Sequence, residues 1–275
     1  MGRGIGIVAG SGAFVSEAVS ELSRRGLRCA VVGIKGESDP GIAAAADSFL
    51  SVKWGEFGRA LAFFQSQGIN EILLLGKVRP GIVLRRRNFD AQTWKRLEGL
   101  KKKSAPEILE AVFALLESQG IKVMSPGFLL APHFCRPGVL TRTAPSREIL
   151  KDIDFGLRVA RRAADLEIGQ TVVVKDGVVI AVEGLEGTDR AIRRGGRLAG
   201  PGFVVVKAGR TSQDMRIDIP AIGLATIQEI VRAGGVALGI ESGKVAFFQK
   251  EESVALADSQ GLSIAARAIG KKRGG

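Results

Sequence analysis

Hydrophobic and polar positions in the first half of the chain alternate between short apolar runs and amphipathic segments. The apolar runs predict buried strands, and the amphipathic segments, most of them followed by glycine, predict helices. The predicted strands are 5–9, 27–34, 71–75 and 121–124, and the predicted helices are 14–25, 54–67 and 106–119. Strands that alternate with helices indicate a parallel sheet with crossover connections. We therefore predict an α/β fold with an N-terminal Rossmann-like domain.

The second half of the chain adds a hairpin to this alternation. TVVVKDGVVIAVE places β-branched runs on both sides of Asp176 and Gly177, a strong signal for a two-residue turn. The other predicted elements are helices 149–165, 189–194 and 224–233, strands 203–208, 236–240 and 244–248, and a helix end at 258–261. Prolines cluster between residues 125 and 146 and indicate a linker. We predict an N-terminal domain of residues 1–133 and a catalytic C-terminal α/β domain of residues 134–275.

The segment SQDMRIDIPAIG, residues 212–223, alternates charged and apolar positions, which predicts a strand that ends before Pro220. The charged residues share one parity: Asp214, Arg216 and Asp218. A solvated outer strand and a site for a charged substrate both fit this pattern. On a straight strand, Asp214 and Asp218 would lie about 13 Å apart and could not share an ion. Asp218 is the stronger catalytic candidate, because α/β folds place their chemistry where strands end.

A glycine-rich turn, IVAGSGAF, follows the first predicted strand. Gly10, Ser11 and Gly12 would let backbone N–H groups approach a phosphate or a carboxylate. A dinucleotide fingerprint needs a third glycine where this chain has Val15, so NAD is not expected. A tight turn between strand and helix explains the same glycines equally well.

Three acidic residues cluster in VEGLEGTDRAIRRGG: Glu183, Glu186 and Asp189. Thr188 suits the N-cap of the following helix, and Asp189 suits its first turn. Capping explains neither of the two glutamates, which lie beside glycines. Glycines next to acids suggest the close approach of a ligand or an ion.

Composition narrows the chemistry of any site. The chain has one histidine, His133, no tyrosine, and two widely separated cysteines among 275 residues. A histidine-rich metal site and a zinc or disulfide framework are therefore not expected. A bound metal should have oxygen ligands, which favours Mg²⁺ or Mn²⁺.

The net charge of +12 should attract anions such as nucleotides, nucleic acid or acidic lipid headgroups. The basic runs are dispersed and aromatic residues make up 5% of the chain, which argues against a nucleic-acid groove. No apolar run predicts a membrane span, and the first residues lack the pattern of a secretory signal. We expect a cytoplasmic protein.

Several longer motifs resemble those of the LpxI family: AGSGAF, LLLGKV, GQTVVVKDGVVIAVEGLEGTD, VVVKAGRTSQDMRIDIPAIG and ALGIESGKV. The resemblance covers nearly the whole chain. It implies hydrolysis of the pyrophosphate of UDP-2,3-diacylglucosamine to UMP and 2,3-diacylglucosamine 1-phosphate (lipid X) in lipid A biosynthesis. It also implies a divalent metal, two domains with the substrate between them, and a catalytic aspartate at the position of Asp218. Where relatives tend to carry acids before helix 106–119, this chain has Lys103-Ser104-Ala105, so a role for such acids does not transfer.

Together these observations define an expected site. The expected catalytic residues are Asp218 and Asp214. The expected substrate-binding residues are Gly10, Ser11, Gly12, Lys77, Gln170, Gly187, Thr188, Lys207, Gln213 and Arg216. The expected ligands of Mg²⁺ or Mn²⁺ are Asp218, Glu186, Asp189 and Glu183. The expected partners are the substrate, its two products and the inner face of the cytoplasmic membrane, with no nucleic acid; a homodimer stays open. Two rival classes also stay open: a non-hydrolytic Rossmann-type nucleotide-binding protein and a basic nucleic-acid-binding protein.

Overall fold

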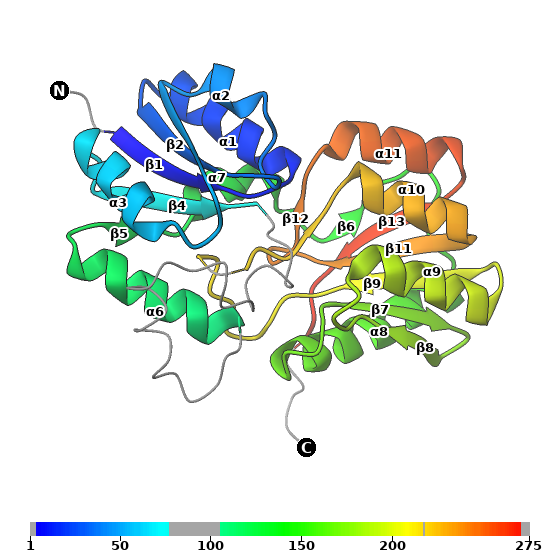
Figure 1. The fold of residues 1–275 in the computed structure, drawn as a ribbon. Helices are drawn as coiled ribbons and strands as arrows, with labels where there is room; N and C mark the ends of the chain where they lie inside the picture. Colours follow the sequence, from blue (N-terminus) through cyan, green and yellow to red (C-terminus); the bar gives the residue numbers. More distant parts are fainter. Residues whose placement is uncertain (1–3, 77–104, 217, 271–275) are drawn as a thin grey trace. The chain divides into compact units, whose positions relative to one another are not determined.

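The chain contains two compact units (Figure 1). The structure is a computed structural model that describes residues 4–76, 105–216 and 218–270. The first unit comprises Met1–Leu129 and Met215–Ile217. The second unit comprises Leu130–Asp214 and Asp218–Gly275. Each unit is built around one sheet with helices on both faces, so the predicted α/β class is confirmed.

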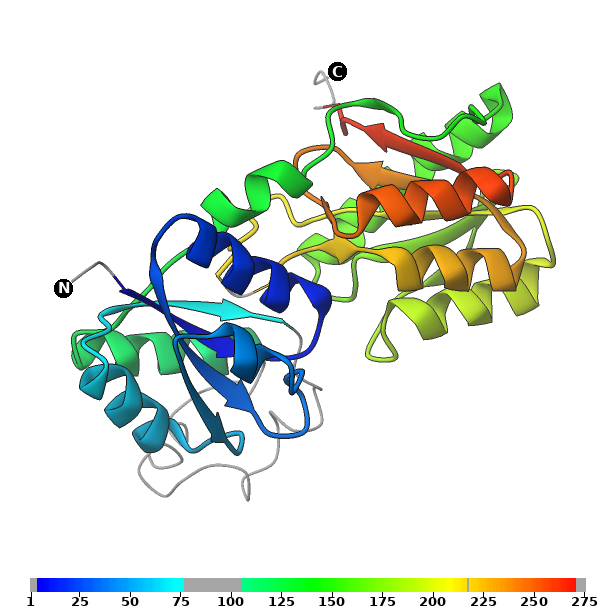
Figure 2. The ribbon, with the colours of Figure 1, turned by 90° about the horizontal axis from the view of Figure 1, so that it is seen from above.

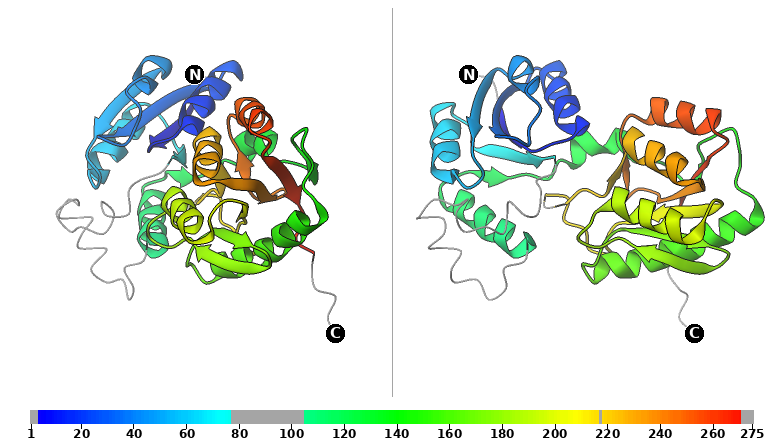
Figure 3. Two further views of the ribbon diagram at one scale, coloured as in Figure 1. Left: turned by 90° about the vertical axis from the view of Figure 1, so that its right-hand side faces the viewer. Right: turned by 45° about the vertical axis from the view of Figure 1, so that its right-hand side comes forward.

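The first unit has a parallel five-stranded sheet with the strand order β3-β2-β1-β4-β5. Its strands are β1 (Gly4–Ala9), β2 (Arg28–Ile34), β3 (Ser48–Val52), β4 (Glu71–Leu75) and β5 (Lys122–Val123). Its helices are α1 (Ala13–Arg24), α2 (Ile42–Ala45), α3 (Phe57–Ser66), α6 (Ala105–Ser118) and α7 (Gly127–Leu130). Figures 2 and 3 show α1 on one face of the sheet and α3 and α6 on the other. The predicted parallel sheet is confirmed, but β3 was missed because this edge strand is short and only partly buried.

The second unit has a six-stranded mixed sheet with the order β6-β13-β11-β9-β7-β8, and a separate small pair, β10 with β12. The six strands are β6 (Gly138–Val139), β7 (Thr171–Lys175), β8 (Val178–Val182), β9 (Phe203–Lys207), β11 (Gly235–Glu241) and β13 (Ser263–Arg267). The pair is β10 (Ala221–Ile222) and β12 (Ala246–Phe247). Asp176 and Gly177 both have positive φ, 50° and 75°, as a type I′ turn requires. The predicted hairpin is therefore confirmed as β7 and β8.

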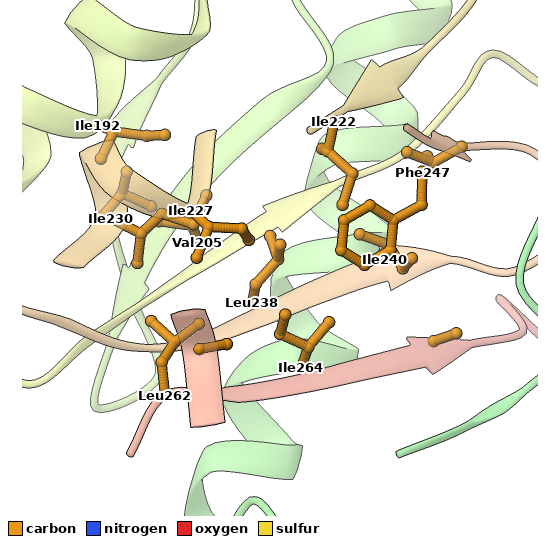
Figure 4. Packing of buried hydrophobic residues seen from close by; sticks show 14 of the residues in the cluster. Ile192, Val205, Ile222, Ile227, Ile230, Leu238, Ile240, Phe247, Leu262 and Ile264 are labelled. Carbon is orange, nitrogen blue, oxygen red and sulfur yellow. The ribbon is translucent and has the colours of Figure 1, made fainter. Parts of the chain in front are cut away.

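Alternating side chains of the second sheet supply two separate cores. One face packs against α8 (Arg147–Asp165), where Ile153 and Leu157 meet Val204 and Val206. The opposite face packs against three helices: α9 (Thr188–Ala199), α10 (Leu224–Ala233) and α11 (Lys250–Ser259). Figure 4 shows this second core, in which residues from sheet and helices interdigitate. Burial of apolar side chains on both faces holds the sheet rigid at the edge where its polar residues gather.

Helix α9 is longer than predicted, because two glycines that were interpreted as a stop lie inside it. A Cβ added to Gly195 would lie 2.7 Å from a methyl group of Val173 in the sheet. A Cβ on Gly196 would lie 2.7 Å from the carbonyl oxygen of Ala233 in α10. The two glycines therefore allow close packing of α9 against the sheet and against α10, and the predicted end at residue 194 is wrong.

The described residues of segment 212–219, which are all but residue 217, form no strand, contrary to the prediction. Asp218 N–H donates to the carbonyl oxygen of Asp214 at 3.2 Å, so the chain turns back within four residues. The separation of about 13 Å expected for a straight strand is therefore also wrong. A local bond from Asp218 to Asp214 and a side-chain bond from Gln213 to Asp218 take the place of sheet pairing here, so the alternation of charged and apolar residues does not reflect a sheet.

Both cysteines are buried and free, which predicts low reactivity in the folded protein. Burial, with the nearby charge of Asp47, raises the pKa of the Cys29 thiol to about 12, and burial also raises the pKa of Cys135. Because the thiolate is the nucleophile, iodoacetamide at mildly alkaline pH should modify neither cysteine until the protein is unfolded. Mass spectrometry of native and guanidinium-treated samples checks this, and rapid labelling of either native thiol would contradict it.

Candidate active site

The polar residues of the second unit gather where β9 ends. Strands β7 and β9 are antiparallel, and their register places Thr171 opposite Lys207. The hairpin then returns β8 to the same edge, where Glu183 N–H donates to the carbonyl oxygen of Thr171 at 2.9 Å. Helix α9 begins five residues later, at Thr188. The topology therefore brings Gln170, Glu183, Thr188 and Lys207, all predicted site residues, to one edge of the sheet.

Lys207 lies at the centre of this group and is 5% exposed. Its ammonium donates to the hydroxyl of Thr171 at 3.1 Å and to that of Thr188 at 2.9 Å. It also lies 3.8 Å from a carboxylate oxygen of Glu183. A buried ammonium is unfavourable unless it has such partners. The two hydroxyls and the carboxylate therefore stabilise the positive charge of Lys207 at this edge of the sheet.

Glu183 is the anion that balances this lysine. Its carboxylate accepts hydrogen bonds from the Thr188 hydroxyl at 2.9 Å and from the backbone N–H of Gln170 at 3.3 Å. Burial raises the pKa of Glu183, but the charge of Lys207 and the hydrogen bonds outweigh burial and hold the pKa below its usual value. Glu183 is therefore ionised at neutral pH and is committed to Lys207 and its neighbours.

The N-terminus of α9 opens into the same group. Thr188 was predicted to be the N-cap, but Gly187 has this position, with φ at 84°, and Thr188 is the first helical residue. The Thr188 hydroxyl is used by Glu183 and Lys207, and no side chain of the described residues caps the first turn of α9. An uncapped helix N-terminus beside an ammonium group attracts anions, phosphates in particular.

Asp218 is linked to this group through Gln170 and to its own loop through Gln213. The side-chain amide of Gln170 donates to the Asp218 carboxylate, while the backbone N–H of Gln170 binds Glu183. The side-chain amide of Gln213 donates to the Asp218 carbonyl oxygen at 2.8 Å. The predicted residues Asp218, Gln170 and Gln213 therefore form one hydrogen-bonded chain that ends at the lysine.

The four predicted metal ligands do not come together. Glu183 binds Lys207 and its neighbours, while Glu186 forms an ion pair with Arg194 at 2.5 Å and Asp189 is exposed on the first turn of α9. Among the residues that the structure describes, no three histidine, cysteine, aspartate or glutamate side chains could jointly hold a metal ion. A metal cage built from these four carboxylates alone does not fit this arrangement, because two of them already neutralise basic side chains.

The glycine turn belongs to the first unit, at the end of β1. Gly10 N–H donates to the carbonyl oxygen of Leu75 at 2.8 Å, and a Cβ on Gly76 would lie 2.8 Å from the carbonyl carbon of Gly10. Gly12 has φ at 121°, a conformation that other residues rarely adopt. Close packing and this backbone conformation explain these glycines in part without a ligand.

Arg216, a further predicted residue, belongs to the first unit. The guanidinium carbon of Arg216 lies 5.3 Å from the ring centroid of Phe113 in the first unit. Lys77 lies outside the described residues.

Family models match nearly the whole chain. The LpxI N-terminal domain matches residues 4–132, and the LpxI C-terminal domain matches residues 136–265. The chain belongs to the LpxI family. UDP-2,3-diacylglucosamine pyrophosphatase LpxI from Caulobacter vibrioides is 31% identical to it over 274 residues, which is 95% of this chain and 96% of the relative.

Solved structures of other families add nothing to this assignment. The biotin carboxylase subunit of pyruvate carboxylase is 14% identical, with a TM-score of 0.29 over 73% of this chain and 43% of that chain. A UDP-glucose-4-epimerase from Stenotrophomonas maltophila is 13% identical, with a TM-score of 0.32 over 97% of this chain and 94% of that chain. Neither likeness is close enough to support an argument about this member of the LpxI family.

The LpxI-family chain also uses residues that its sequence did not single out. Thr171 contributes a hydroxyl to Lys207, and Arg161 and Glu241 bind the loop that leads to Asp218. Glu241 ends the apolar strand GVALGIE, and a charged residue at a strand end was the signal that could have found it.

No helix in the described part of the chain combines the length and the apolar character needed to cross a membrane.

Proposed function

We propose that this protein hydrolyses the pyrophosphate of UDP-2,3-diacylglucosamine to UMP and lipid X in lipid A biosynthesis. The family and the name of the Caulobacter relative support the substrate and the reaction. The observation that carries the proposal is the convergence of a buried ammonium, an uncapped helix N-terminus and a held aspartate at one edge of the second sheet. The ammonium and the helix N-terminus can bind a diphosphate. The aspartate can accept a proton from a water molecule that attacks the diphosphate.

Each group then has a defined task in our proposal. Lys207 and the first N–H groups of α9 bind the diphosphate and stabilise the charge that develops on its oxygens. Asp218 accepts a proton from the attacking water, whose oxygen forms a bond to one phosphorus while the bond from that phosphorus to the bridging oxygen breaks. The proton goes to the Asp218 carboxylate, and the bridging oxygen leaves with the other phosphate. Gln170 and Gln213 hold Asp218 in place for this transfer.

A divalent metal remains part of the proposal, although the four-carboxylate set does not form. Magnesium commonly binds one or two carboxylates together with substrate phosphates, and it does not require a cage of protein ligands. Asp218, whose carboxylate accepts a hydrogen bond from the neutral amide of Gln170, fits such a shared ion. When bound, the metal would neutralise phosphate charge and lower the pKa of a water molecule.

Incubation with UDP-2,3-diacylglucosamine and identification of the products tests the activity directly. We expect UMP and lipid X in equal amounts. Tight binding of the nucleotide sugar without turnover would favour the non-hydrolytic nucleotide-binding alternative. Salt-dependent binding of DNA or RNA without turnover would favour the nucleic-acid alternative.

Removal of divalent metal should abolish the reaction. We expect EDTA to stop hydrolysis and excess Mg²⁺ or Mn²⁺ to restore it, because oxygen ligands and a diphosphate favour these ions. Product formation over time is the measurement, with apo-protein checked by elemental analysis. Full activity of the metal-free protein would overturn the metal dependence and leave the substrate assignment intact.

We also propose that the enzyme works in the cytoplasm at the inner face of the cytoplasmic membrane. The substrate carries two acyl chains, and the net charge of +12 is attracted to acidic headgroups. Sedimentation with vesicles of acidic and of zwitterionic lipid tests this association, and equal recovery with both vesicle types would contradict the electrostatic part.

A further inference from the structure

A group of charged side chains outside the active site holds the loop that follows β9 and carries Asp218. The loop begins after Lys207 and has no regular structure up to Pro220 in its described residues. Such a loop would be mobile if only its own backbone bonds held it. Each of its residues from 209 to 211 instead has a backbone group bound by a charged side chain from elsewhere in the second unit.

Gly209 is bound on both sides of its backbone. Nε of Arg161, from α8, donates to the Gly209 carbonyl oxygen at 2.7 Å. The Gly209 N–H donates to Oε2 of Glu241, the last residue of β11, at 3.2 Å. Arg161 and Glu241 also bind each other, and their side chains are only 17% and 6% exposed. The pair therefore binds both sides of one glycine, and Arg161 also donates to the Thr211 hydroxyl at 3.4 Å.

The next two residues of the loop are bound by a lysine and an aspartate. The ammonium of Lys244 donates to the carbonyl oxygens of Arg210 at 2.7 Å and Thr211 at 2.9 Å. Asp165, the last residue of α8, accepts from the Thr211 N–H at 2.6 Å and from its hydroxyl at 2.8 Å. These contacts fix the direction in which the chain leaves the sheet.

The bound part of the loop is connected to Asp218 by one side chain. The amide oxygen of Gln213 accepts from Arg210 N–H at 2.9 Å, and its amide nitrogen donates to the Asp218 carbonyl oxygen at 2.8 Å. The order of contacts runs from Arg161 and Glu241, through the loop backbone and Gln213, to Asp218. The charged side chains that bind residues 209–211, here called the clamp, can therefore act on Asp218 without touching the substrate.

We infer that Arg161, Glu241 and Lys244 are positioning residues, which place the Asp218 carboxylate for catalysis through the backbone of residues 209–211. This inference rests on the proposed function, since it assigns a task to residues that act through Asp218. A buried ion pair adds little stability compared with apolar residues of the same size. The pair of Arg161 and Glu241 therefore matters here through its directional hydrogen bonds to one loop. A displacement of about 1 Å in a reacting group can lower the rate on the order of 100-fold.

The chain offers a matched control in a second ion pair between α8 and a strand end. Arg267, the last residue of β13, binds Asp154 of α8 through two hydrogen bonds of 2.9 Å and 2.8 Å. It lies opposite Glu241 in the parallel register of β11 and β13. The bonds of this pair do not involve the loop at 209–213, so Arg267→Gln removes an arginine and leaves the bonds to that loop in place.

The experiment compares Arg161→Gln with Arg267→Gln in turnover, Michaelis constant and thermal unfolding. We expect Arg161→Gln to lower kcat by 10-fold or more while KM changes less than about threefold, because the diphosphate-binding Lys207 is untouched. We expect Arg267→Gln to keep kcat within about twofold. Equal kcat for the two variants, or a loss confined to KM, would overturn the inference.

A second variant keeps the inference testable if Arg161→Gln does not fold. Lys244→Met removes two bonds to loop carbonyls without leaving a buried charge unpaired, and it should lower kcat several-fold with a small change in Tm. Unchanged kcat in folded Lys244→Met would count against the clamp. If Asp218→Ala proves fully active, the proposed function loses its catalytic aspartate, whereas failure of the clamp alone leaves Asp218→Ala inactive and these variants active.

Discussion

Asp218→Ala should lose most of its turnover, on the order of 100-fold or more, and remain folded. The expected loss follows from removal of the group that accepts the proton of the attacking water. The fold should survive because Asp218 lies in a loop, where its carboxylate accepts a hydrogen bond from the neutral amide of Gln170. Binding of the substrate should also survive, since Lys207 and the N-terminus of α9 keep the diphosphate contacts. Steady-state kinetics and thermal unfolding measure the two effects separately.

Two companion variants make the Asp218 result specific. Asp218→Asn keeps the shape and can still accept the Gln170 hydrogen bond, so it isolates the loss of charge. Asp154→Ala removes an aspartate of the same unit that binds Arg267 outside the loop of Asp218, and it should keep its turnover. A fully active Asp218→Ala would refute the assignment. Loss of activity together with loss of the fold would show that the aspartate is structural.

Periodicity predicted most elements of the fold because burial dominates them. The strands of the first sheet and helices such as α10 bury continuous or 3.6-periodic apolar faces, and their bounds were predicted within a few residues. The errors fall where other forces decide the structure. Gly195 and Gly196 look like a helix end in sequence, but in the structure they give α9 room against Val173 and Ala233.

The loop that carries Asp218 shows a second kind of error in the prediction. Its alternation of charged and apolar residues is what a half-buried strand would show, yet its backbone turns at Asp214 and is bound by side chains from α8 and β11. These partners lie 30 to 50 positions away in sequence, so no local pattern could reveal them. The residue types of the site could be predicted, because lysine, threonine and acids beside glycines signal anion chemistry. Which acid neutralises which base could not.

Lys207→Met should damage both stability and activity, because it leaves the Glu183 carboxylate buried without its cation. Removal of one partner of a buried ion pair typically costs about 3–5 kcal/mol of unfolding free energy. Turnover should fall on the order of 100-fold, as for loss of a group that stabilises charge in the transition state. Denaturant unfolding and steady-state kinetics give the two values.

The double variant Lys207→Met/Glu183→Gln separates these two effects. Neutralising the orphaned carboxylate should restore much of the stability, since Thr188 and the Gln170 N–H can still bond an amide oxygen. It should not restore turnover, because the ammonium that binds the diphosphate is still missing. Recovery of turnover with stability would mean that Lys207 is structural only.

The pH dependence of stability offers an independent check on the same pair. In the native protein the pKa of Glu183 is lowered, so its contribution to stability is complete above its ordinary pKa and is lost as pH falls through the native value. In Lys207→Met the attraction of the lysine is gone while burial, which raises the pKa of Glu183, remains. The variant should therefore lose less stability than the native protein as pH falls, and the gap between the two proteins should narrow as both are acidified. A gap that is constant from acidic to neutral pH would show that Lys207 and Glu183 are not coupled through charge.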